Sequence, residues 1–170
     1  IMSSVADMSK WVMMQLNRGK YGDGNSRQML SETVHREMWT PQTIMRLRNP
    51  GPYRSHFAAY GLGWSLTDVA GYLQASHTGG LAGIVTQVTL IPELKLGIIV
   101  FTNQQEGSAF TAITNTIKDG YLDVKGNDWV KTLRENVDRN LNEAKRITDE
   151  IWAKIEAQRS EGADQVSNAV

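Results

Sequence analysis

The sequence predicts an α/β fold of the α+β type, in which helices flank an antiparallel sheet and a long amphipathic helix follows. Three observations carry this prediction. Apolar residues recur at steps of three and four near the start of the chain and again after residue 108, which is helical spacing. Between residues 60 and 102 they alternate or run in short continuous segments, as in strands. From residue 128 to residue 159 there is neither Gly nor Pro.

Length and composition set the outer limits of the fold and function. The 170 residues include 18 Lys and Arg against 18 Asp and Glu, and 41% are hydrophobic, which suits one domain or part of a larger one. A net charge of zero argues against nucleic acid as a partner. No run has the ~18–20 apolar residues of a membrane span, so none is expected. The absence of Cys excludes disulfides, thiol catalysis and cysteine-based zinc sites.

Two helices are expected in the first 40 residues. Ser4 is placed to cap the first helix, and the carboxylate of Asp7, three residues on, can complete the cap. Gly19 is placed to end this helix. A loop over residues 19–26 and a short helix over residues 31–39 follow, and Thr40-Pro41 ends that helix. The chain begins with Ile1 and no leader-like segment precedes it, so we expect a processed or excised piece.

Four strands are expected next. They cover residues 60–66, 72–78, 84–91 and 96–102. A glycine cluster (Gly79, Gly80 and Gly83) is expected to break the run after the second strand. The connections are short, which favours antiparallel pairing because parallel neighbours need a crossover of about a dozen residues.

The remaining chain is expected to be helical. A helix begins near Ser108, with an apolar face formed by Phe110, Ile113, Ile117, Tyr121 and Val124. A long amphipathic helix follows, with Glu135–Arg139 and Glu150–Lys154 spaced for ion pairs. The domain prediction is therefore a domain over residues 1–126, a connector helix over 127–160 and a flexible tail over 161–170.

Of the three histidines, His77 has the context of a functional residue. It stands near the end of a predicted strand, followed by Thr78-Gly79-Gly80, where a ligand can approach the backbone and N–H groups can face a developing negative charge. An ordinary exit from a strand into a loop has the same spacing. His35 and His56 are interpreted as solvated or core-edge histidines. No residues have metal-ligand spacing, so neither a metal nor a cofactor is expected.

Three segments together resemble the C-terminal part of the penicillin-recognising serine hydrolases: class C β-lactamases, D-alanyl-D-alanine carboxypeptidases and related esterases. These segments are Tyr60-Gly61-Leu62-Gly63-Trp64, His77-Thr78-Gly79-Gly80 and the strand ending Ile98-Ile99-Val100-Phe101-Thr102-Asn103. Residues 3–11 and Thr40-Pro41-Gln42 also resemble that family. The resemblance covers residues 1–124, and the helix from Trp129 resembles a connector to a further domain. It implies part of a β-lactamase/transpeptidase-like fold and a bacterial protein of the periplasm or exterior.

The resemblance also implies a mechanism and a set of site residues. In the family a Ser-x-x-Lys serine attacks a carbonyl group of an ester, amide or lactam, and a Tyr-x-Asn element assists proton transfer. His77 and Gly80 match catalytic positions, and Thr78 and Gly79 match substrate-binding ones, with Gly80 N–H as half of an oxyanion hole. The substrate is expected to be a small molecule or a peptide.

The sequence departs from the family pattern at the nucleophile. It contains neither Ser-x-x-Lys nor Tyr-x-Asn. We therefore expect the chain alone to be inactive and its partner to be a missing N-terminal segment or a swapped chain.

Two other functions remain open. In the first, the chain is a non-catalytic scaffold or interaction module that uses its long helix. In the second, it is a binding protein derived from such a hydrolase. Residues Tyr60–Trp64 are interpreted as structural sheet, with Gly61 and Gly63 permitting close packing of a helix.

Overall fold

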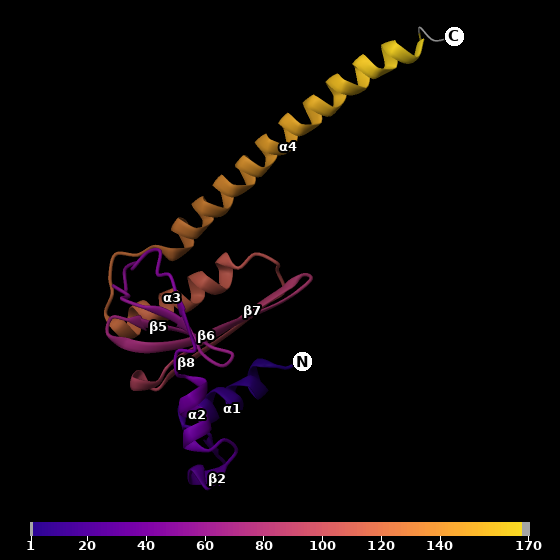
Figure 1. Cartoon of the computed structure of the whole chain (residues 1–170). Coiled ribbons are helices and arrows are strands. Elements are labelled where there is room, and N and C mark those ends of the chain that lie inside the picture. The colour runs from indigo at the N-terminus through magenta and orange to yellow at the C-terminus, as the bar shows by residue number, and fades with distance from the viewer. Residues whose placement is uncertain (1, 168–170) are drawn as a thin grey trace. The chain divides into compact units, whose positions relative to one another are not determined.

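A computed structural model describes residues 2–167, apart from the side chains of residues 161 and 163–167. The chain divides into two compact units, Ile1–Trp129 (unit 1) and Val130–Val170 (unit 2), which we describe separately. Figure 1 labels several of the elements along the chain. The helices of unit 1 are α1 (Val5–Leu16), α2 (Glu32–Met38) and α3 (Ser108–Leu122), with 3₁₀ turns η1 (Asp23–Asn25) and η2 (Pro92–Leu94). Its strands are β1 (Lys20–Tyr21), β2 (Arg27–Gln28), β3 (Thr43–Met45), β4 (Ala58–Tyr60), β5 (Ser65–Val69), β6 (Tyr72–Leu81), β7 (Ile84–Ile91) and β8 (Leu96–Thr102).

The main sheet is a six-stranded antiparallel meander in the order β3-β4-β5-β6-β7-β8, and β1 pairs with β2 in a separate small hairpin. This confirms the predicted α+β fold with an antiparallel sheet. The strands β7 and β8 have the predicted bounds, and α3 begins at Ser108 as expected. The short strand β3 was not predicted.

The strand expected over residues 60–66 is wrong, because the chain turns inside it. Tyr60 ends β4 and Ser65 begins β5, and these two residues pair with each other. The N–H of Gly61 donates to the carbonyl oxygen of Trp64 at 2.8 Å, and Gly63 has a φ of 81°, which closes the turn. The alternation of glycine with large apolar residues resembled strand spacing, but it encodes a tight connection between two strands.

The glycine cluster does not end the second predicted strand either. Gly79 and Gly80 lie inside β6 and pair with Thr86 and Val85 of β7. The reversal comes two residues later, at Ala82-Gly83, where Gly83 has a φ of 82°. The hairpin β6–β7 is therefore longer than the sequence indicated.

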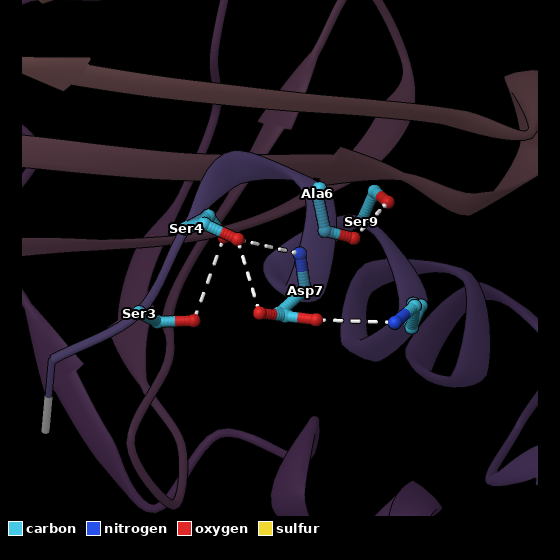
Figure 2. Close-up of polar contacts among 6 residues, drawn as sticks. Ser3, Ser4, Ala6, Asp7 and Ser9 are labelled. Atoms are coloured by element: carbon cyan, nitrogen blue, oxygen red, sulfur yellow. Dashed lines mark hydrogen bonds and ion pairs between the residues drawn. The ribbon is translucent and has the colours of Figure 1, made fainter.

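The start of α1 follows the predicted cap (Figure 2). The side-chain oxygen of Ser4 accepts a hydrogen bond from the backbone N–H of Asp7 at 3.1 Å. The Ser4 hydroxyl also donates to Asp7 Oδ2 at 3.0 Å, and Asp7 Oδ1 accepts from Lys10 at 3.1 Å. One cap thus satisfies an otherwise unpaired N–H and places a carboxylate in the first turn, where the helix dipole favours it.

Each face of the sheet carries its own core. One face packs beneath α1 and α2, with Trp64 only 2% exposed and its ring 5.4 Å from that of Trp11 and 5.7 Å from that of Trp39. The other face packs beneath α3 and buries apolar residues of β7 and β8. This second core contains Tyr53, Val69, Ile91, Leu96, Ile98 and Val100.

The apolar face predicted for α3 is wrong in its middle. The structure buries Ala112, Thr114 and Lys118 against the sheet. Ile113, Ile117 and Tyr121 are 46%, 37% and 59% exposed. Helical spacing therefore located the helix correctly but assigned most of its inner face to the wrong residues.

Unit 2 contains the helix α4 (Trp129–Ser167), whose first residue, Trp129, is the last residue of unit 1. The helix extends beyond the predicted end at residue 160, and residues 168–170 of the expected tail lie outside the described residues. Its ion pairs differ from those expected: Arg146 pairs with Glu143 and Glu150, while Arg139 donates to Asn136. Among residues 2–167, no helix combines the length and apolar character needed to cross a bilayer.

Candidate functional site

The candidate site lies where β6 has a neighbour on one side only. β5 pairs with residues Tyr72–Ser76 of β6 and does not reach further along that strand. From His77 to Leu81, β6 pairs with β7 alone. We call residues His77–Leu81 the open edge of β6. In Figure 1 the hairpin that contains it, labelled at β7, extends beyond the other strands of the sheet.

The register shows which backbone groups face the open edge. Leu81 pairs with Ile84 across a two-residue turn, and in such a hairpin the two flanking residues exchange hydrogen bonds. Because antiparallel pairs alternate between bonded and non-bonded, Thr78 and Gly80 direct their N–H and C=O groups away from β7. The N–H of Gly80 therefore faces the open edge, as an oxyanion donor requires.

The two glycines of the segment have different surroundings. A Cβ atom at Gly80 would have no heavy atom within 4 Å, so the space beside it is open. A Cβ atom at Gly79 would lie 2.6 Å from Oγ1 of Thr86 on β7. Gly79 is therefore packed closely against the Thr86 side chain, whereas the face of the strand at Gly80 is open.

His77 is exposed, and among the described residues its side chain makes one polar contact. Its Nε2 lies 3.1 Å from the hydroxyl oxygen of Tyr60 at the end of β4. The sequence had assigned Tyr60 to structural sheet, so this contact was missed. The two residues are 17 positions apart, and only the turn at Gly61–Trp64 and the pairing of β5 with β6 bring them together.

Beneath the site, polar side chains connect α3 to the sheet. Gln87, which pairs with Thr78, accepts a hydrogen bond from Thr114 at 2.7 Å. Lys118, one turn along α3, donates to Gln74 of β6 at 3.1 Å and lies 4.1 Å from the ring centre of Tyr53. These contacts attach β6 and β7 to α3, and no sequence motif indicated them.

Burial changes the ionisation of two of these groups. Burial of the ammonium group, partly offset by the nearby Asp119 carboxylate, lowers the pKa of Lys118 to about 8. Burial of the phenol, together with its hydrogen bond to Asp119, raises the pKa of Tyr53 far above its usual value.

The other two histidines have structural contacts. His35 is 7% exposed, its ring centre lies 4.8 Å from that of Trp39, and burial lowers its pKa. His56 is at the surface, with Nδ1 2.7 Å from Oδ2 of Asp68. Burial of the Asp68 carboxylate raises its pKa, but hydrogen bonds from the ring of His56 and from the backbone of His56 and Phe57 outweigh this and lower it to about 2. Within the described residues, no group of three or more His, Asp or Glu side chains is placed to hold a metal ion.

Comparison with known proteins identifies the class of protein. The family model for Beta-lactamase matches residues 1–120. The chain therefore belongs to the β-lactamase family, which confirms its predicted relationship to the β-lactamase and penicillin-binding-protein serine hydrolases.

Individual relatives are similar over most of this chain. Unguisins hydrolase ungD' of Aspergillus campestris is 29% identical over 147 residues, which are 84% of this chain and 26% of that protein. Unguisins hydrolase ungD of Aspergillus violaceofuscus is 28% identical over 138 residues, which are 75% of this chain and 24% of that protein. The chain thus spans about a quarter of the length of these curated relatives. The octameric penicillin-binding protein homologue from Pyrococcus abyssi is 23% identical, with a TM-score of 0.49 over 60% of this chain and 20% of that chain.

Proposed function

We propose that the open edge of β6 is one wall of the acyl-transfer site of a β-lactamase-related serine hydrolase. The observation that carries this proposal is the orientation of Gly80. Its backbone N–H faces away from β7, and among the described residues a Cβ atom at this position would have no heavy atom within 4 Å. A preorganised N–H donor in such a position stabilises the oxyanion of acyl transfer, and loss of one donor typically costs 10²–10³ in rate.

The reaction proposed for this site is acyl transfer to a serine. The hydroxyl oxygen bonds to the carbonyl carbon of an ester, amide or lactam, and the negative charge on the carbonyl oxygen is held by Gly80 N–H and the N–H of the nucleophile. Collapse of this intermediate breaks the bond to the leaving group, which takes up the proton that the serine hydroxyl lost. Water then hydrolyses the acyl ester, which releases the acyl group as an acid and restores the serine hydroxyl. Thr78 binds a carboxylate of the substrate and His77 contacts the reacting groups, while Gly79 keeps β6 close to β7.

In this proposal the nucleophile comes from chain outside these 170 residues. The sequence contains neither Ser-x-x-Lys nor Tyr-x-Asn, and the curated relatives are about four times as long as the part that matches. The partner is an upstream segment of the same protein or a second chain that supplies it. The relatives are named as hydrolases of unguisins, and we extend only the hydrolase class to this chain.

Labelling with a fluorescent penicillin or a fluorophosphonate tests this function. We expect the 170-residue chain alone to remain unlabelled and a longer chain with upstream sequence to be labelled. Covalent labelling of the short chain would contradict the assignment of the nucleophile. A longer chain that carries Ser-x-x-Lys but stays unlabelled by both probes would contradict the hydrolase mechanism.

A second candidate function is that of an interaction module, and α4 favours it. Within the described part of its unit, this helix of 39 residues has no second element against which to bury its apolar stripe. Sedimentation of the whole chain beside a chain that ends at residue 128 tests this candidate. Association that is lost with α4 supports it, and two monomers contradict self-association through this helix.

A further inference from the structure

We propose that Tyr60 is a positioning residue for His77. In this proposal the Tyr60 hydroxyl sets the orientation and the tautomer of the His77 ring. The relevance to acyl transfer rests on the function proposed above for the open edge of β6. The contact itself does not depend on that function, and it can be tested separately.

The contact between the two side chains is polar. The Tyr60 hydroxyl oxygen lies 3.1 Å from Nε2 of His77, and the ring centres are 6.4 Å apart with the planes tilted by 59°. Among the described residues, neither the Tyr60 hydroxyl nor either ring nitrogen of His77 has another hydrogen-bond partner. Since the rings do not stack, the hydrogen bond is the feature that selects one orientation of an otherwise exposed imidazole.

The backbone at Tyr60 is held from both sides. Tyr60 pairs with Thr43 of β3 and Ser65 of β5, and its carbonyl oxygen accepts a hydrogen bond from the N–H of Gln42 at 2.8 Å. A hydroxyl carried on paired strands is placed more accurately than one on a loop.

The turn after Tyr60 is fixed against α2. The N–H of Leu62 donates to the carbonyl oxygen of Met38, the last residue of α2, at 2.9 Å. A Cβ atom at Gly61 would lie 2.4 Å from that same oxygen, so only glycine permits this approach. Trp64 then enters the core between Trp11 and Trp39.

Strand β5 links this turn to His77. Ser65, the residue after Trp64, pairs with Ser76, the residue before His77. Both ends of the Tyr60–His77 contact therefore belong to one hydrogen-bonded framework. The segment Tyr60–Trp64, interpreted from the sequence as structural, has a second role in placing the Tyr60 hydroxyl.

The direction of the hydrogen bond follows from acidity. A phenol is a stronger acid than the N–H of a neutral imidazole, so the Tyr60 hydroxyl donates and Nε2 accepts. A neutral imidazole carries one proton, which then resides on Nδ1. His77 then keeps Nδ1–H as its free donor, which is suited to hold an oxygen of the substrate or its leaving group.

Nitrogen-15 NMR of the histidine side chains tests the proposal on the 170-residue chain. At a pH where His77 is neutral, we expect the wild type to show mainly the Nδ1–H form. Tyr60→Phe should shift His77 toward the Nε2–H form that an unrestrained imidazole favours. Tyr72→Phe, which removes a hydroxyl from the same strand as His77, is the matched control and should leave the pattern unchanged.

Two results would overturn the proposal. One is a His77 spectrum in Tyr60→Phe identical to that of the wild type. The other is a wild type in which the Nε2–H form of His77 already dominates. That measurement uses no variant, so a folding defect cannot explain its result. Acylation of a longer, active chain is a separate test: its failure would count against the proposed function and leave the tautomer result standing.

Discussion

The two halves of β6 share a backbone conformation but differ in what surrounds them. From Tyr72 to Ser76 the strand pairs with β5, Ala75 and Ser76 pair with β7 as well, and Ala75 is fully buried. From His77 to Leu81 it pairs with β7 alone, and its residues are exposed. We call these the inner half and the outer half of β6.

This difference separates residues required by the fold from residues available for chemistry. In the inner half, packing explains Ala75, which faces Leu90 and lies in the core beneath α1. In the outer half, packing explains Gly79 but not His77, Thr78 or Gly80. A polar, glycine-rich segment that the core does not require is where binding and catalysis are expected.

The largest difference in stability is expected between two leucine-to-alanine variants, one opposite the inner half and one in the outer half. Leu90→Ala removes a fully buried side chain opposite the inner half and should lower the free energy of unfolding by about 2–5 kcal/mol. Leu81→Ala in the outer half, where the side chain is 65% exposed, should change it by less than ~0.5 kcal/mol. Urea unfolding of both variants measures this, and equal losses would contradict the division of β6.

A second comparison concerns charge beneath the inner half. Lys118→Met replaces a buried ammonium group that has no carboxylate within ion-pairing distance among the described residues, so it should raise the free energy of unfolding at pH 7 by about 1–2 kcal/mol. Lys125→Met, at an exposed lysine, is the control and should change it little.

The same pair of variants has a predicted pH dependence. In the wild type, Lys118 releases its proton at about pH 8 when folded but near pH ~10.4 when unfolded. The unfolded state therefore binds more protons in this window, and Lys118 makes stability rise with pH by up to about 3 kcal/mol. This rise should persist in Lys125→Met and disappear in Lys118→Met. A wild type whose stability matches that of Lys118→Met at every pH from 7 to 10 would show that the ammonium group is not buried.

A third comparison is between two neighbouring glycines within the outer half. Gly79→Ala forces a methyl group against Thr86 and should destabilise the protein by about 1–3 kcal/mol. Gly80→Ala adds a methyl group in open space and should cost less than ~0.5 kcal/mol. Thermal or urea unfolding checks this order, and the reverse order would mean that β6 and β7 pair in a different register.

The sequence predicted the elements whose signals are local. β8 is a mostly apolar run, β7 is rich in Ile, Val, Leu and Thr, and turn residues bound both strands. Ser4 caps α1 through Asp7, which is only three residues away. The division between β4 and β5 was missed because Gly61 and Gly63 alternate with apolar residues just as a strand would. The burial of Lys118 could not be predicted, since nothing nearby in the sequence shows that Gln74 and Tyr53 lie opposite it.

The candidate site also has one part that the sequence predicted and one part that it did not. His77-Thr78-Gly79-Gly80 could be selected from the sequence because its residues are adjacent and match a family motif. The contact from Tyr60 could not be predicted, because it depends on the turn at Gly61, the clamp to Met38 and the register of β5 with β6.

The most direct test of the account is the acylation rate of a longer chain that supplies the nucleophile, measured for His77→Ala and His56→Ala. The two substitutions are identical in chemistry, but only His77 lies on the open edge of β6. We predict that His77→Ala lowers the rate by about 10- to 1000-fold with the fold intact, and that His56→Ala stays within about twofold of the wild type. A His77→Ala chain that is folded and acylated at the wild-type rate would contradict the central claim.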